Sequence, residues 1–296
     1  MKKIFSFFIF LCVLTAIFGG CAAQQQTQIA TTTLPVYEFT AAICRGTPLT
    51  VTRLVTEEVS CLHDYSLNVR QVKAAEAAEV IVISGAGLED FLEGILDEDK
   101  LIDSSRGIEL ICPEEEHGHD HSHNPGDDHN HDKDPHIWLS PENAKIMAGN
   151  ICRELSCLYP EYAADFESNL QELLEELDCL QRYAEETLSD LSCRELLTFH
   201  DGFAYFAESF QLTILEAVEE ESGSEASARE LIHLIEITNH HNLPAIFTET
   251  NGSPSAAQVI SRETGAKIFT LDMAMSGESY FEAMYHNINT VKEALG

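Results

Sequence analysis

Four side chains stand where a transition metal ion could be bound. His63 follows an expected strand, and His136 lies two residues before Trp138, the single tryptophan of the chain. His200 and Asp272 each end an expected strand, and open α/β sheets place their ligand crevice at such strand ends. Imidazole and carboxylate are ligands that zinc and similar metals prefer. These four side chains are therefore candidate metal ligands, although a single histidine also has many uses without metal.

A low-complexity segment over residues 116–133 is rich in histidine and aspartate. Almost none of its side chains can enter a hydrophobic core, so we predict a mobile loop that collects metal ions. Its candidate accessory ligands are His117, His119, His121, His123, His129 and His131.

Strand-like and helix-like runs alternate in two parts of the chain. The first part has expected strands at 29–34, 49–54 and 80–84 and helices at 36–44 and 67–78. The second has expected strands at 195–199, 212–215, 245–248 and 267–271 and helices at 204–210, 226–240, 254–264 and from 280 onward. Such alternation predicts parallel sheets covered by helices. We therefore expect an α/β protein with two lobes, over residues 29–160 and 192–296.

The segment between the lobes, residues 161–191, predicts one long helix. Its apolar residues recur at a spacing of three and four, and it contains no proline or glycine. A helix of this length would extend about 45 Å, enough to join both lobes as a rigid backbone. A coiled-coil arm would show the same single stripe and is the alternative.

The beginning of the chain reads as an export signal. Lys2 and Lys3 precede an apolar run that ends in Gly19-Gly20-Cys21. The run is shorter than the roughly 20 residues of a membrane-spanning helix. We expect a signal peptide over 1–20, a lipid anchor on Cys21 and a tether over 21–28, which predicts an extracytoplasmic lipoprotein at the cell surface or in the periplasm.

The charge of the chain restricts its partners. The formal net charge is -33. Nucleic acid and anionic lipid surfaces would be repelled, whereas cations would be attracted. We therefore expect no nucleic-acid partner and membrane contact through the lipid anchor only.

Several motifs resemble those of one family. Asp-Pro-His-x-Trp stands at 134–138, His-x-x-Phe-x-Tyr-Phe at 200–206, and Gly-x-Gly-Leu-Glu at 85–89. In this order they resemble the metal-binding lipoproteins of ABC transporters, the helical-backbone zinc and manganese solute-binding family. The resemblance covers nearly all of the mature chain. It departs around the first candidate ligand, where Leu62 replaces the usual proline and Ser66-Leu67 replaces a Glu-Pro pair.

The resemblance implies a ligand set and a role. His63 and His136 from the first lobe, with His200 and Asp272 from the second, would hold one ion in the interlobe cleft. Manganese-binding members usually have glutamate where His200 stands, so the nitrogen-rich set favours zinc over manganese. Nickel, copper and cobalt also bind clustered imidazoles. The implied role is capture of the ion by a monomer and its delivery to an ABC permease with its ATPase.

Other assignments remain open. Cys61 could offer a thiolate in place of His63, or be a small packed residue. Glu249 is a further carboxylate, which in this kind of fold is expected at the cleft wall. A surface adhesin is a second role found in the family. A zinc hydrolase would also use three histidines, but Asp272 would fill the open position and no His-Glu-x-x-His helix is present.

Overall fold

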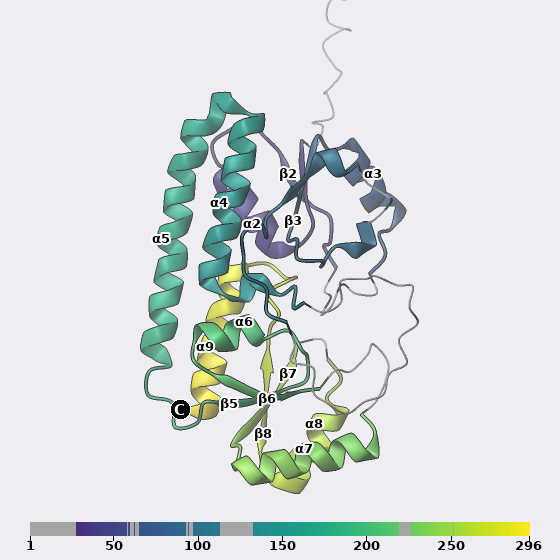
Figure 1. The fold of residues 1–296 in the computed structure, drawn as a ribbon, viewed down its shortest axis with the longest axis vertical. Helices are drawn as coiled ribbons and strands as arrows, with labels where there is room; N and C mark the ends of the chain where they lie inside the picture. The colour runs from purple at the N-terminus through teal and green to yellow at the C-terminus, as the bar shows by residue number, and fades with distance from the viewer. Residues whose placement is uncertain are drawn as a thin grey trace, which may run out of the picture.

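Two parallel sheets build two lobes, stacked along the long axis of the molecule (Figure 1). The computed structural model describes residues 28–57, 59, 62, 65–92, 94, 97–112, 133–218, 226–250 and 252–296. The strand order is β2-β1-β3-β4 in the first lobe and β6-β5-β7-β8 in the second. All described strand pairs are parallel. The predicted α/β fold with two lobes is confirmed.

The first lobe, here called the N lobe, combines its sheet with three helices. Its strands are β1 (Ile29–Thr31), β2 (Val51–Arg53), β3 (Val80–Ile83) and β4 (Leu101–Asp103). Its helices are α2 (Leu34–Ile43), α3 (Val69–Ala77) and α4 (Pro141–Leu158), with short 3-10 turns η1 (Asp90–Leu92), η2 (Glu98–Lys100) and η3 (Ile137–Leu139). The sequence analysis did not predict β4 or α4.

The second lobe, here called the C lobe, repeats this plan. Its strands are β5 (Glu195–Thr198), β6 (Thr213–Ala217), β7 (Ala245–Glu249) and β8 (Lys267–Leu271). Its helices are α6 (Ala204–Ser209), α7 (Ala228–His241), α8 (Ser255–Thr264) and α9 (Tyr280–Leu295). Helix α7 begins with a capping box between Ser227 and Glu230 and ends at Asn242 in the left-handed region, which explains its sharp limits.

One long helix, α5 (Ala163–Thr187), connects the lobes after the turn η4 (Pro160–Tyr162). The apolar stripe of the sequence is buried along it, from Phe166 to Ala184. The helix packs against α4 and α2 of the N lobe and against α9 of the C lobe (Figure 1). A free coiled-coil arm is therefore the wrong reading, because the stripe faces the protein's own core.

The lobes share one hydrophobic core. A single cluster of buried side chains contains residues of α2 and α4 together with residues of α6, β7 and α9. Trp138 is fully buried within it and donates from Nε1 to the Met273 carbonyl at 2.7 Å. The Tyr280 hydroxyl donates to the Trp138 carbonyl at 2.8 Å. These contacts tie η3 of the N lobe to the β8–α9 loop and to the first residue of α9 in the C lobe.

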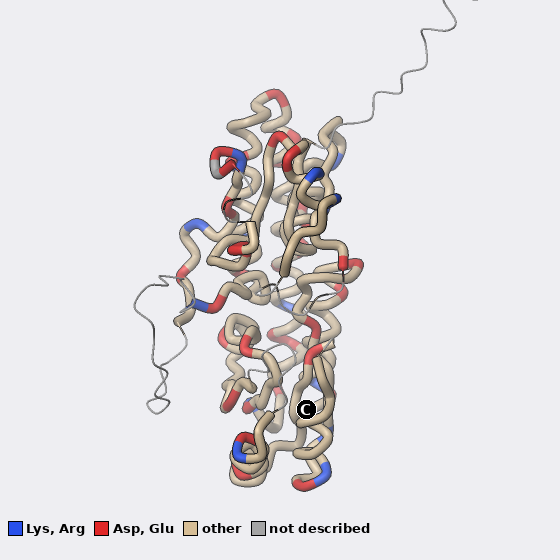
Figure 2. The backbone as a smooth tube through the Cα atoms, turned by 90° about the vertical axis from the view of Figure 1, so that its right-hand side faces the viewer, with Lys and Arg blue, Asp and Glu red and all other residues tan. Residues whose placement is uncertain are grey.

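Acidic side chains are spread over both lobes, with far fewer basic ones between them (Figure 2). A surface of this sign raises the local concentration of cations. In the described part of the chain, no helix has the length and apolar character needed to cross a bilayer.

Glu89, which follows β3 in the N lobe, has a buried carboxyl group. Glu89 accepts hydrogen bonds from the Thr32 hydroxyl at 2.7 Å, from Ser84 N at 2.7 Å and from Gly85 N at 2.9 Å. Burial nevertheless dominates and raises the pKa of Glu89 from 4.5 to about 7. Gly85 has φ +85°, and a Cβ there would collide with Asp103, so this turn requires glycine.

The raised pKa of Glu89 predicts a pH-dependent stability. The pKa of Glu89 is higher in the folded protein than in the unfolded chain. Its contribution to the free energy of unfolding is therefore fully present below about pH 4.5 and is lost as the pH rises through about 7. Glu89→Gln does not titrate. Between pH 5 and pH 8 the free energy of unfolding of the wild type should therefore fall by up to about 3 kcal/mol relative to that of Glu89→Gln, at about 1.4 kcal/mol per pKa unit.

Urea unfolding of the metal-free proteins across this pH range measures the difference. Glu76→Gln, on the exposed side of α3, is the matched control for loss of one carboxylate. A difference between wild type and Glu89→Gln that stays constant with pH would contradict the assignment.

Candidate metal centre

His136 is held rigidly just before η3. The residue is 1% exposed, and its backbone N donates to Asp134 Oδ1 at 2.8 Å. The same carboxylate oxygen lies 2.7 Å from Nδ1 of the imidazole. Pro135 between them fixes one backbone torsion. The Asp-Pro-His sequence therefore orients the ring locally, with Nδ1 occupied and Nε2 directed away from Asp134.

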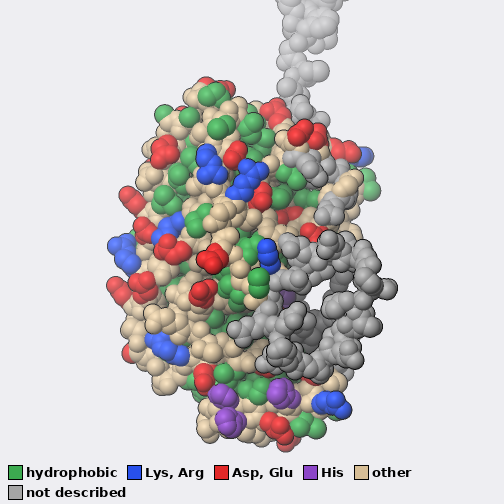
Figure 3. Space-filling model, in the orientation of Figure 1, with side chains coloured by type: hydrophobic (Ala, Val, Ile, Leu, Met, Phe, Trp, Pro, Cys, Tyr) green, Lys and Arg blue, Asp and Glu red, His purple; other side chains and the backbone are tan. Residues whose placement is uncertain are grey.

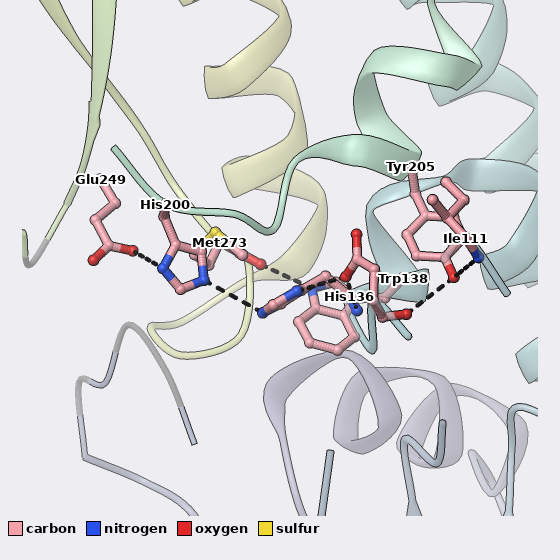
Figure 4. A network of polar contacts seen from close by, with 8 residues as sticks. Ile111, His136, Trp138, His200, Tyr205, Glu249 and Met273 are labelled. Carbon is pink, nitrogen blue, oxygen red and sulfur yellow. Dashed lines mark hydrogen bonds and ion pairs between the residues drawn. The ribbon is translucent and has the colours of Figure 1, made fainter. Parts of the chain in front are cut away.

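His200 follows β5 and faces His136 from the other lobe (Figure 4). The two Nε2 atoms are 3.5 Å apart, and the rings meet edge to face with centroids 5.2 Å apart. On its other side, His200 Nδ1 lies 3.5 Å from Glu249 Oε2. Each imidazole thus has a carboxylate at Nδ1 and presents Nε2 to the other ring.

This spacing fits two ligands of one tetrahedral ion. Zinc binds imidazole nitrogen at about 2.0–2.1 Å, so two nitrogens at a tetrahedral angle are about 3.4 Å apart. Metal-bound imidazoles also usually donate their other N–H to a carboxylate, which fixes the tautomer and raises ligand basicity. Asp134 occupies this position for His136 at 2.7 Å, and Glu249 lies at the corresponding place for His200 at the longer distance of 3.5 Å. One oxygen of Asp134, Oδ2, is buried without a hydrogen-bond partner among the described residues.

Gly202 allows the two imidazoles to approach. A Cβ at this position would lie 2.7 Å from His200 Cδ2 and 3.0 Å from His136 Cε1. It would also lie 2.6 Å from Met273 Cε. The backbone of residue 202 therefore forms a wall of the centre, and any side chain there would force the imidazoles or Met273 to shift.

Asp272 lies at the end of β8, as the sequence predicts, but its carboxylate has local partners. Oδ1 accepts a hydrogen bond from Ala274 N at 2.7 Å. Its backbone N and O pair with the Asn287 side chain, both at 2.7 Å. Among the described residues, no hydrogen bond or ion pair joins the Asp272 carboxylate to either imidazole. Its neighbour Met273 does reach the centre, beside Gly202.

The remaining predicted positions lie outside the described residues. They are His63, Cys61, the anchor Cys21 and the accessory histidines His117, His119, His121, His123, His129 and His131. Within the described ranges, no group of three or more His, Cys, Asp or Glu side chains is arranged to hold a metal. His136 and His200 are the two predicted ligands that the structure brings together.

Further histidines gather at the far end of the C lobe, over the region of α7 (Figure 3). Helix α7 carries His233, His240 and His241, and His241 Nδ1 lies 3.1 Å from Glu195 Oε2. The sequence analysis also missed Gly202 and the pairing of Glu249 with His200. The Asp-Pro-His spacing was a signal for the Asp134 contact, whereas nothing local indicated the other two.

Two α/β lobes are joined by one long helix, and each lobe contributes one imidazole to the centre at their junction. This arrangement could hold one metal ion between the lobes.

Comparison with known proteins identifies the family. The model of the zinc-uptake complex component A, periplasmic (ZnuA) matches residues 29–294, and the chain belongs to this family. The zinc-binding lipoprotein AdcA of Streptococcus pneumoniae is 30% identical over 99% of this chain and 61% of its own length. The chain thus spans about three fifths of that relative.

Solved structures agree with this membership. A crystal structure of ZnuA has a TM-score of 0.76 and 28% identity, covering 91% of this chain and all of the other. A ZnuA deletion mutant with zinc bound has a TM-score of 0.74 and 29% identity, covering 91% of this chain and 98% of the other.

The wall formed by Gly202 generates a prediction. Gly202→Ala should separate the imidazoles and weaken zinc binding at least about tenfold, within the range seen when groups supporting metal ligands are changed. Competition with a chromophoric chelator measures this. Gly149→Ala, in α4, is the control because a Cβ there meets nothing within 4 Å. Gly149→Ala should keep full zinc affinity. Equal zinc affinity in the two variants would show that the backbone of residue 202 does not set the spacing of the imidazoles.

Proposed function

We propose that this protein captures zinc outside the cytoplasm and delivers it to the permease and ATPase of an ABC importer. The observation that carries the proposal is the pair of imidazole Nε2 atoms, 3.5 Å apart and contributed by different lobes. Each is supported at Nδ1 by a carboxylate. Membership of the zinc-uptake family supports the same conclusion.

The complete ligand set is part of the proposal. We assign His63 and His136 from the N lobe and His200 and Asp272 from the C lobe. For Asp272, Oδ1 accepts from Ala274 N, which leaves the other carboxylate oxygen to bind the metal. Three imidazoles and one carboxylate suit zinc better than manganese, which prefers oxygen ligands. Nickel also binds imidazole, but a tetrahedral ligand set suits zinc better than nickel.

Capture and release follow from the architecture. An ion held by side chains of both lobes adds a bond across the cleft, which stabilises the closed arrangement. The shared core and α5 limit the lobes to small tilts, so release requires the permease to separate them. The protein acts as a monomer, anchored through a lipid on Cys21, and binds its ion without catalysis.

Native mass spectrometry of the mature protein with equimolar zinc and manganese tests the site. The wild type should hold one zinc ion, and His200→Glu should lose it or exchange it for manganese, because one soft nitrogen becomes a hard oxygen. His233→Glu makes the same change on the exposed surface of α7 and should keep the zinc. Full zinc retention by His200→Glu would show that the ligand assignment is wrong.

The same preparation separates transport from hydrolysis. A catalytic zinc keeps an open position for water, whereas four protein ligands close the site. The zinc-loaded protein should not cleave ester or peptide substrates above the rate of the metal-free protein. Zinc-dependent turnover that disappears in His200→Glu would favour a hydrolase.

The accessory role of the histidine-rich segment has its own test. We propose that residues 116–133 bind additional ions weakly and raise the zinc concentration near the centre. Deletion of 116–132 should lower the number of zinc ions in native mass spectra and leave one tightly bound ion. Loss of the tightly bound ion instead would show that the deleted segment contributes to the tight site.

A further inference from the structure

A tyrosine of the C lobe connects the two ends of the segment that precedes His136. Tyr205 lies in α6 and is 2% exposed. Its hydroxyl donates to the Asp134 carbonyl at 3.0 Å and accepts from Ile111 N at 3.0 Å. Asp134 N in turn donates to the Ile111 carbonyl at 2.9 Å. The three residues form a closed hydrogen-bonded triangle across the lobe boundary, and Figure 4 shows the contact between the Tyr205 hydroxyl and Ile111 N.

The triangle is connected directly to the metal centre. Asp134, whose carbonyl Tyr205 binds, is also the residue whose carboxylate holds His136 through both N and Nδ1. Tyr205 itself belongs to the short segment that begins with His200. One segment of the C lobe therefore supplies His200 and also fixes the support of His136.

The Tyr205 hydroxyl can donate one hydrogen bond and accept another at neutral pH. Burial raises the pKa of Tyr205 to about 12, so the hydroxyl keeps its proton at neutral pH. A protonated hydroxyl can donate to a carbonyl and accept from an N–H at the same time, as it does here. The aromatic ring packs in the shared core and would remain there in a phenylalanine variant.

We infer that Tyr205 is a positioning residue for His136, acting through Asp134 to set the spacing of the two imidazoles. The inference rests on the proposed zinc site. Its physical basis is that metal affinity depends on ligand orientation, which groups beyond the ligands control. Without the hydroxyl, Ile111 N and the Asp134 carbonyl lose a buried partner, and the Asp-Pro-His turn is free to shift relative to His200.

Tyr205→Phe tests the inference. Zinc affinity, measured by chelator competition, should fall about tenfold, the lower end of the effect known for supporting groups. The cobalt-loaded variant should also show altered d–d absorption at saturation, since those bands report ligand geometry rather than stability. Tyr183→Phe, which removes a hydroxyl bonded to exposed Asn289, is the matched control and should match the wild type.

A double-mutant cycle with Asp134→Asn tests the route. If Tyr205 acts through Asp134, the two changes should affect zinc affinity non-additively. Additive effects, or a wild-type cobalt spectrum and affinity in Tyr205→Phe, would overturn the inference. Should Tyr205→Phe fail to fold, Asp134→Asn alone must weaken zinc binding for the inference to stand.

The comparison separates two failures. A wild-type protein that binds no zinc would overturn the proposed function and this inference with it. Tight wild-type binding that persists unchanged in Tyr205→Phe would overturn the inference alone.

Discussion

The burial of Trp138 at the junction of the lobes is the contact on which the rest of the structure depends. Its indole N–H needs an acceptor once it is removed from water, and the Met273 carbonyl of the other lobe provides it. The Tyr280 hydroxyl then binds the Trp138 carbonyl. His136 lies two residues before Trp138, and the side chain of Met273 reaches the metal centre. The buried indole therefore positions the His136 segment of the N lobe and the Met273 segment of the C lobe on either side of the centre.

The architecture then explains why a binding centre forms between the lobes. Parallel strands bring their carboxyl ends to one edge, and β5, β7 and β8 end in or next to His200, Glu249 and Asp272. The N lobe contributes His136 from the turn before η3. A ligand bound there touches both lobes, while the common core and α5 restrict how far they move. Ligands shared between two lobes can separate when the lobes tilt apart, and this suits reversible capture.

The net charge of the protein and the polar groups of the metal centre act on a cation at different distances. The excess of acidic side chains attracts cations over the Debye length but cannot distinguish zinc from other divalent ions. In the proposed centre, selection between metals falls to the few ångströms around Nε2 of His136 and His200, and a carboxylate lies at Nδ1 of each ring. The buried Glu89 shows a different use of a carboxyl, since its three hydrogen bonds stabilise the turns at the N-lobe sheet edge.

The sequence alone determined the alternation of strands and helices, the buried stripe of α5, and His136 and His200 as candidate ligands. These follow from local spacing, because periodicity and short motifs are properties of neighbouring residues. It did not indicate β4 or α4. Only the tertiary structure decided that Glu249 supports His200, that Gly202 forms a wall, and that Tyr205 binds the Asp134 carbonyl. The residues in these contacts are far apart in sequence or come from different elements, so their meeting depends on how the two lobes pack together.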